Sequence, residues 1–237
     1  MSRVGELLVA GIDLSGRTTG TTALAWLTGT ASRERPVLDR PVVADGLRGA
    51  GGDERIVSLV ADARPDVVAI DAPLYLPHAV ICRDEDCGRC FPPGGAYPSC
   101  TTRRLERKER WDPPMIRPPM PMVMVAGIAF RAIFLKRLLE RDGIRVIETW
   151  PAGVFRRMQG APGRASPLDA ATRARLLLGC VDDPGQQLRR PDLPLDALDA
   201  VAAALAAWAY VTDWFHPVKD DGWLDEGAII LPGAAPA

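Results

Sequence analysis

The sequence has almost no net charge, with 29 lysine and arginine residues against 30 aspartate and glutamate residues among 237. A chain without an overall positive charge is not built as a nucleic-acid coat protein or as a protein held on a membrane surface. The balance still leaves room for a nucleic-acid substrate, because an enzyme needs only a local basic patch. A hydrophobic content of 47% is ample for a folded core.

Long hydrophobic runs are also missing. The most apolar stretch, residues 122–130, is followed by Arg131 and Lys136, and its nine residues cannot span a bilayer. The first residues lead directly into a predicted strand and lack the pattern of a signal peptide. We therefore expect a soluble, cytoplasmic protein without membrane contact.

Several familiar catalytic and nucleotide-binding motifs are absent. The sequence has no dinucleotide-binding glycine fingerprint and no Ser-His-Asp arrangement, and its two histidines are His78 and His216. Gly11 and Gly16 have the spacing of a phosphate-binding loop, but the lysine and the strand placement that give this loop its mechanism are missing. Function must therefore be sought in other residue types.

The hydrophobic pattern predicts one α/β domain over residues 1–232, with a frayed tail at 233–237. Three apolar runs joined by short connections predict an antiparallel meander: 7–14, 22–27 and 36–44. Residues 66–71 form a continuous apolar run, which is typical of a central strand covered on both faces. Further segments predict a strand at 145–150, a hairpin within 222–231, and helices at 53–63, 122–141, 152–158, 168–178 and 195–210. This order predicts a mixed sheet flanked by helices.

An irregular insertion rich in cysteine and proline interrupts this pattern at residues 75–120. It holds four of the five cysteines: Cys82, Cys87, Cys90 and Cys100. In a cytosolic protein such a cluster favours metal or redox chemistry over structural disulfides. Four thiolates suit a zinc ion that anchors the insertion, and the first three also have the spacing of a plant-type iron–sulfur site. Free cysteines packed as small apolar side chains are the alternative to zinc that ranks ahead of an iron–sulfur cluster.

A basic run follows the cysteines at residues 103–110. Such a run is commonly a solvated helix face with charge pairs along it. The functional interpretation is an arm that binds substrate, in which Arg103 and Arg104 contact phosphates and Trp111 stacks on a base.

Acidic residues lie where the sequence otherwise predicts buried structure. Asp13 and Asp71 end predicted strands, Asp196 and Asp199 share one face of a helix, and Glu148 lies on a strand. Each has a local explanation: turn capping for the strand ends, the helix dipole for the helical pair, and a salt bridge to an arginine for the glutamate. Unpaired buried carboxylates are costly, however, and a divalent metal is the simplest way to compensate several of them together.

The segments around these acids resemble the motifs of domain-of-unknown-function family 429, which is described as predicted nucleases of the ribonuclease H-like superfamily. The segments that carry the resemblance are Gly11-Ile12-Asp13, Ala69-Ile70-Asp71-Ala72-Pro73, Ile147-Glu148-Thr149-Trp150-Pro151 and Asp196-Ala197-Leu198-Asp199-Ala200. The resemblance covers nearly the whole chain. The resemblance implies a ribonuclease H-like mixed sheet, in which the antiparallel meander is extended by parallel strands.

The resemblance also implies a nuclease site with two cations at these acids. Asp13 would bridge the cations, and Asp71 with one or both of Asp196 and Asp199 would complete the site. Glu148 is a further catalytic candidate from its family motif, without an assigned role as a metal ligand. Hard oxygen ligands suit Mg²⁺ or Mn²⁺, and neither histidine is needed. Two cations about 4 Å apart would support in-line hydrolysis of a phosphodiester bond in a nucleic acid or nucleotide.

Two other functions stay open from the sequence. The chain could be a non-catalytic module that binds nucleic acid or nucleotide, with acids that only cap turns. It could also be a metal- or redox-sensing protein that works through its cysteine insertion. Only the nuclease interpretation requires the acids to come together.

Overall fold

The structure is a computed structural model, and it describes residues 5–15, 21–32, 35–47, 49–90, 103–106, 122–159, 168–218 and 226–233. Several predicted features fall wholly or partly outside these ranges, among them Cys100, Trp111 and residues 234–237.

A mixed sheet with strand order β3-β2-β1-β4-β5-β7-β6 forms the centre of the molecule. Strands β1, β2 and β3 are joined antiparallel, β4, β5 and β7 continue the sheet parallel to β1, and β6 closes it antiparallel to β7. The strands are β1 (Glu6–Asp13), β2 (Ala23–Thr30), β3 (Val37–Leu38), β4 (Val67–Asp71), β5 (Arg145–Thr149), β6 (Phe215–Val218) and β7 (Ile229–Pro232). The meander extended by parallel strands confirms the ribonuclease H-like fold class predicted from the sequence.

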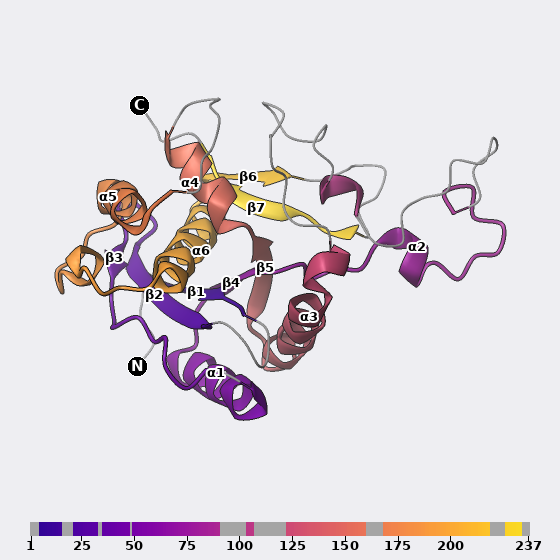
Figure 1. Cartoon of the computed structure of the whole chain (residues 1–237), viewed down its shortest axis with the longest axis horizontal. Helices are drawn as coiled ribbons and strands as arrows, with labels where there is room; N and C mark the ends of the chain where they lie inside the picture. Colours follow the sequence, from indigo (N-terminus) through magenta and orange to yellow (C-terminus); the bar gives the residue numbers. More distant parts are fainter. Residues whose placement is uncertain are drawn as a thin grey trace.

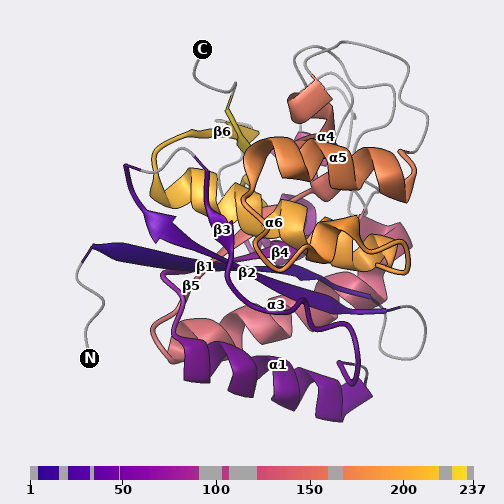
Figure 2. The same cartoon turned by 90° about the vertical axis from the view of Figure 1, so that its left-hand side faces the viewer.

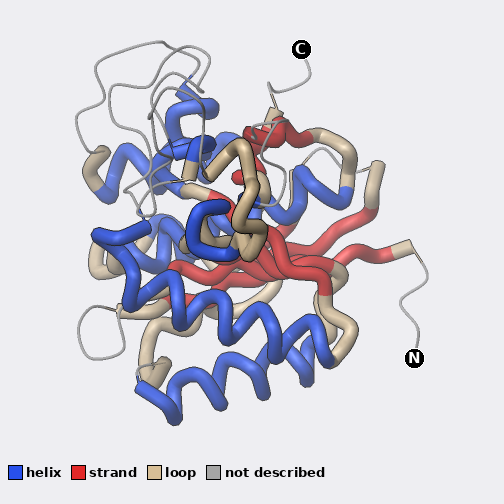
Figure 3. Tube along the Cα trace, turned by 90° about the vertical axis from the view of Figure 1, so that its right-hand side faces the viewer, coloured by secondary structure: helices blue, strands red, loops and turns tan. Residues whose placement is uncertain are grey.

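Helices cover both faces of this sheet, as Figures 1 and 2 show. One face packs against α1 (Gly49–Ala63) and α3 (Ala126–Arg141), and the other packs against α6 (Leu195–Val211). Outside α6 lie α4 (Pro151–Gln159) and α5 (Ala170–Cys180). Because α6 lies between the sheet and these two helices, it is buried almost all round, which explains its apolar sequence. Figure 3 shows the two helical layers with the strands between them.

Close packing of β1 on α6 depends on Gly11. A Cβ atom at this position would lie 2.1 Å from the backbone nitrogen of Ala204 and 2.2 Å from the carbonyl oxygen of Ala200. The alanines of α6 and the glycine of β1 therefore let the two backbones approach closely. This contact fixes the height of α6 above the sheet and with it the position of any side chain on the first turns of α6.

The two ends of the sheet differ from the sequence prediction. The predicted third strand, 36–44, is reduced to the two residues of β3 and an isolated bridge between Val43 and Leu24. The predicted hairpin within 222–231 is wrong, because β7 pairs with β6 and with β5. The pattern hid β6 because Pro217 lies in its centre, and proline in a strand is confined mostly to sheet edges such as this one.

The insertion is described at residues 75–90 and 103–106. It contains the short helix α2 (His78–Ile81), turns that lead to Cys90, and the 3₁₀ helix η1 (Arg104–Glu106). A second 3₁₀ helix, η3 (Met122–Val125), leads into α3. Across the described ranges, no helix combines the length and the apolar character needed to cross a bilayer.

Candidate functional site

Asp13 and Asp71 lie side by side at the ends of two neighbouring parallel strands. They are register partners at the carboxyl ends of β1 and β4, and hydrogen-bonded strands run about 4.8 Å apart. Val9 and Ala69 belong to the core beneath α6, whereas the residues directly before the two aspartates pack on the opposite face. Since side chains alternate along a strand, Asp13 and Asp71 point to the face that α6 covers.

The helix α6 brings two further carboxylates to this place. Asp196 lies in its first turn and Asp199 three residues later, and both are partly buried. Because Gly11 packs against Ala200, the end of β1 runs beneath the first turns of α6. The charges of Asp196 and Asp199 accordingly both act on Asp13.

These carboxylates make one another harder to ionise. Burial, and then the charges of Asp71, Asp199 and Asp196, raise the pKa of Asp13 from 3.8 to about 9. Burial followed by the charges of Asp199 and Glu148 raises the pKa of Asp71 well above its ordinary value. Burial also raises the pKa of Asp199. The site therefore holds acids that keep their protons without a counter-charge, and a bound cation would favour their ionised form.

Arg173 on α5 supplies a positive charge to this group. It forms an ion pair with Asp199, and its Nε donates a hydrogen bond of 3.1 Å to the carbonyl oxygen of Leu168. The charge of Arg173 lowers the pKa values of Asp13, Asp71 and Asp199 against the larger effect of burial. One arginine does not outweigh burial and the neighbouring acids, so the pKa values of Asp13, Asp71 and Asp199 stay raised.

The donor set of this carboxylate site, Asp13, Asp71, Asp196 and Asp199, fits a hard divalent cation. It offers carboxylate oxygens from two strands and one helix, and among the described side chains neither histidine nor cysteine belongs to it. Mg²⁺ and Mn²⁺ prefer such ligands. The structure thus brings together the four aspartates that the sequence singled out, and their roles in metal binding and catalysis stay predictions.

Glu148 does not join this site. Ile147 packs in the core beneath α6, so its neighbour Glu148 points to the other face of β5. There the carboxylate accepts bonds of 2.7 and 2.5 Å from the guanidinium of Arg103 and a bond of 2.8 Å from the backbone N–H of Leu74. Its charge still reaches Asp71. The prediction of Glu148 as a catalytic residue is therefore corrected: it is the partner of Arg103, as the salt-bridge explanation of the sequence allowed.

The position of Arg103 contradicts its interpretation as a phosphate-binding residue. Its side chain is fully buried, and besides Glu148 it binds Glu106, at 2.7 Å, and the carbonyl oxygen of Glu226, at 3.2 Å. A guanidinium held on these sides has no free edge for a phosphate. The other two predicted substrate-binding side chains lie outside the described part of the structure: Arg104 and Trp111.

Three of the four clustered cysteines come together, and a histidine joins them. One potential ligand atom from each of His78, Cys82, Cys87 and Cys90 lies within 4.8 Å of all the others. The sequence interpretation set His78 aside because a carboxylate site needs no histidine. The available signal was the spacing of His78 and Cys82, four residues apart, which places them on one side of a helical turn. Cys100, the fourth predicted ligand, lies outside the described residues.

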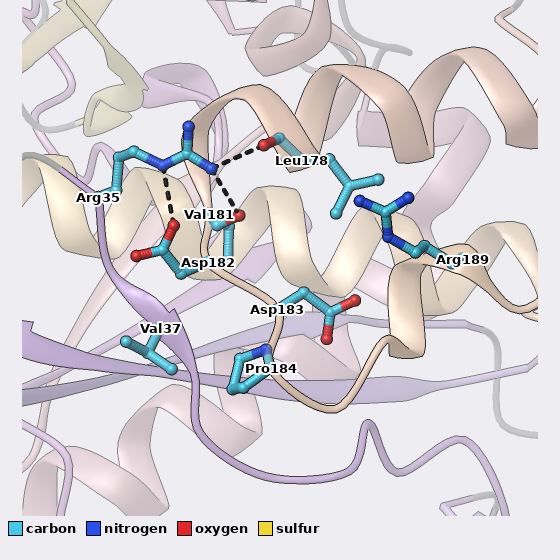
Figure 4. Close-up of a pocket in the computed structure, with 8 residues that line it drawn as sticks. All are labelled: Arg35, Val37, Leu178, Val181, Asp182, Asp183, Pro184 and Arg189. Atoms are coloured by element: carbon cyan, nitrogen blue, oxygen red, sulfur yellow. Dashed lines mark hydrogen bonds and ion pairs between the residues drawn. The ribbon is translucent and has the colours of Figure 1, made fainter.

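A surface pocket of about 540 Å³ lies where β3 meets the end of α5 (Figure 4). Arg35 is one of its lining residues and donates to Asp182 and to the carbonyl oxygens of Leu178 and Val181. The backbone N–H of Leu38 donates to the carbonyl oxygen of Asp182. These bonds attach the edge strand β3 to the loop after α5, so the pocket is part of an edge closure and is separate from the carboxylates.

Comparisons with known proteins place this geometry in context. A family model described as "Protein of unknown function (DUF429)" matches residues 11–221. A comparison with curated proteins gives no match. Similar solved structures include RuvC from Thermus thermophilus, with 16% identity and a TM-score of 0.47 over 87% of this chain and 97% of that one.

Two further structures show similar values. T. thermophilus RuvC in complex with a Holliday junction substrate has 18% identity and a TM-score of 0.48 over 87% of this chain and 96% of that one. The yeast mitochondrial Holliday junction resolvase Ydc2 has 11% identity and a TM-score of 0.45 over 86% of this chain and 77% of that one.

Proposed function

Given that the chain belongs to the DUF429 family, we propose that it is a metal-dependent nuclease that hydrolyses phosphodiester bonds at Asp13, Asp71, Asp196 and Asp199 with two divalent cations. The observation that carries the proposal is the convergence of these four carboxylates at one edge of the sheet, where burial and neighbouring acids raise the pKa values of Asp13, Asp71 and Asp199. Acids that only capped turns would have no reason to converge from β1, β4 and α6.

The residues divide into two groups by their origin. Asp13 and Asp71 would hold the cations from the sheet, and Asp199, with Asp196 beside it, would hold them from α6. Mg²⁺ or Mn²⁺ supplies Lewis-acid stabilisation of the phosphate and a lowered pKa for the attacking water. Strand register and the Gly11–α6 contact place the backbones that carry these ligands, and the carboxylates would still have to draw closer together to share a cation.

Arg173 has two functions in this proposal. In the metal-free chain it lowers the pKa of Asp199 and so favours the ionised carboxylate that a cation requires. With Asp199 neutralised by a bound cation, the guanidinium of Arg173 would be available to a phosphate, which it could bind with two parallel hydrogen bonds.

Activity is tested with the purified full chain on single-stranded DNA, duplex DNA, a four-way DNA junction and RNA, each with Mg²⁺, with Mn²⁺ and with EDTA. We expect cleavage of at least one substrate with either cation and none in EDTA. Asp13→Asn and Asp71→Asn should each lower the rate by at least about 100-fold while circular dichroism shows an intact fold. Asp62→Asn, at an exposed position of α1, is the matched control and should cleave like the wild type.

Metal binding is tested separately with crystals soaked in Mn²⁺ and anomalous scattering at the manganese edge. Manganese between Asp13 and Asp71, with Asp196 or Asp199 as a further ligand, would support the proposal. Wild-type turnover by Asp13→Asn would overturn the mechanism. Tight binding of nucleic acid with neither cleavage nor manganese at the aspartates would instead make the chain a binding module.

A further inference from the structure

The segment that follows β4 carries a second group of metal-ligating side chains, away from the carboxylate site. His78 begins α2, Cys82 follows its last turn, and Cys87 and Cys90 form a tight Cys-x₂-Cys turn. The backbone N–H of Cys90 donates to the carbonyl oxygen of Cys87, at 2.9 Å, and the N–H of Cys82 donates to that of His78, also at 2.9 Å. Two local turns thus present two pairs of ligands to each other.

We propose that His78, Cys82, Cys87 and Cys90 bind one zinc ion, which holds the segment after Asp71 in place. The set of three sulfurs and one nitrogen is a closed tetrahedral set of the kind found in structural zinc sites. It assigns His78 as the fourth ligand, in the place where the sequence alone suggested Cys100.

The spacing of the donor atoms fits a single ion. All four lie within 4.8 Å of one another, and Nε2 of His78 is 3.5 Å from Sγ of Cys87. Zinc–sulfur bonds of 2.3 Å at tetrahedral angles place two sulfurs about 3.8 Å apart. Small side-chain rotations would therefore complete the site. An iron–sulfur cluster divides its ligands among several irons and would require a wider separation.

The surroundings of the cluster explain why an ion is needed there. The three cysteines are only partly buried, and residues 83–86 are largely exposed. A segment with so little apolar burial cannot hold a defined shape by packing alone, whereas metal binding supplies folding free energy directly.

The cluster is connected to the elements beneath the carboxylate site. The backbone N–H of His78 donates a 2.8 Å hydrogen bond to the carboxylate of Glu226, whose carbonyl oxygen accepts from Arg103. Arg103 in turn binds Glu148, which also accepts from the N–H of Leu74, three residues after Asp71. The network thus runs from His78 to Leu74, near the end of β4. A zinc ion bound to His78 would stabilise this segment of the chain, which is a structural role.

The test measures metal content and ligation in the full chain, without reference to nuclease activity, so it stands whether or not the proposed nuclease function holds. We expect about one zinc ion per chain by mass spectrometry, and X-ray absorption at the zinc edge should show three sulfur ligands and one nitrogen ligand. Cys87→Ser should lower the zinc content at least about tenfold, whereas Cys180→Ser, on α5, should leave it unchanged. Chelation of zinc from the wild type should lower its melting temperature, and added zinc should restore it.

His78→Ala and Cys100→Ser separate the two candidate fourth ligands. We expect the nitrogen ligand to disappear from the absorption spectrum of His78→Ala and the spectrum of Cys100→Ser to match the wild type. A wild-type spectrum with four sulfur ligands, a visible absorption band from bound iron, or a chain purified and titrated without zinc uptake would each overturn the proposal. The wild-type measurements decide the question even if a variant fails to fold.

Discussion

Asp13 and Asp71 are register partners on adjacent parallel strands, and the charge of Asp71 adds to burial in raising the pKa of Asp13. A pair of acids placed in this way opposes folding when both are charged and no cation is present. The strand pairing that builds the sheet is thus also the origin of the unusual electrostatics of the site.

Removal of the Asp13 charge should stabilise the metal-free protein at neutral and alkaline pH. Folding raises the pKa of Asp13 from 3.8 to about 9, so between these values the native chain binds a proton that the unfolded chain has lost. Stability from this group is complete below pH 3.8 and is lost as the pH rises through 9. In EDTA, urea unfolding of the wild type should lose up to about 1.4 kcal/mol per pH unit relative to Asp13→Asn.

Magnesium should make the wild type more stable than Asp13→Asn, the opposite of the order expected in EDTA. The cation binds the native carboxylates and stabilises the wild type by mass action, whereas Asp13→Asn lacks a ligand and should respond little. Parallel pH dependences for the two proteins in EDTA would show that Asp13 ionises normally and would contradict the electrostatic description of the site.

Arg173 should compete with a cation for the same carboxylates. Arg173→Gln removes the ion partner of Asp199, so the metal-free variant should be less stable than the wild type. A divalent cation can replace the missing charge, so the rise in melting temperature on addition of Mg²⁺ should be larger for Arg173→Gln than for the wild type. Arg175→Gln, at an exposed position of the same helix, is the matched control and should respond to Mg²⁺ like the wild type.

The parts of the fold that could be predicted from the sequence are those with a strong local pattern. Asp13 and Asp71 close apolar runs long enough to identify as strands, and parallel strands end at the same edge of a sheet, so their approach followed from the order of elements. Asp196 and Asp199 were identified because acids are unexpected in an otherwise apolar helix.

The residues that were missed or misplaced depend on information that a local pattern does not contain. β5 is buried on both faces, so it shows no alternation that would reveal the face to which Glu148 points. Arg173 is one of two arginines on a mixed helix, and only the packing of α5 on α6 gives it an acidic partner. His78 is a candidate ligand only because the chain turns back after α2 and brings Cys87 and Cys90 close to it.

The buried pair of Arg103 and Glu148 should contribute strongly to stability. Glu148→Gln leaves the Arg103 guanidinium with one charged partner fewer in a buried place, and we expect a loss of roughly 3–5 kcal/mol in the free energy of unfolding. Glu140→Gln breaks an ion pair with Lys136 on the surface of α3 and should cost less than about 1 kcal/mol. Equal losses in the two variants, measured by urea denaturation, would show that the buried pair stabilises the fold no more than the surface pair does.

Gly11→Ala should separate the packing of α6 from the chemistry of the carboxylates. The new methyl group would meet backbone atoms of Ala200 and Ala204, which cannot rotate away, so α6 must move outward. We expect a loss of about 3 kcal/mol or more in the free energy of unfolding. Because α6 carries Asp196 and Asp199, the shift should also weaken Mn²⁺ binding, measured by calorimetry on the folded fraction.

Gly51→Ala is the matched control: its methyl group meets nothing within 4 Å on helix α1. It should raise stability by up to about 1 kcal/mol and leave Mn²⁺ affinity unchanged. Unaltered Mn²⁺ affinity in Gly11→Ala would mean that the aspartates of α6 are not ligands.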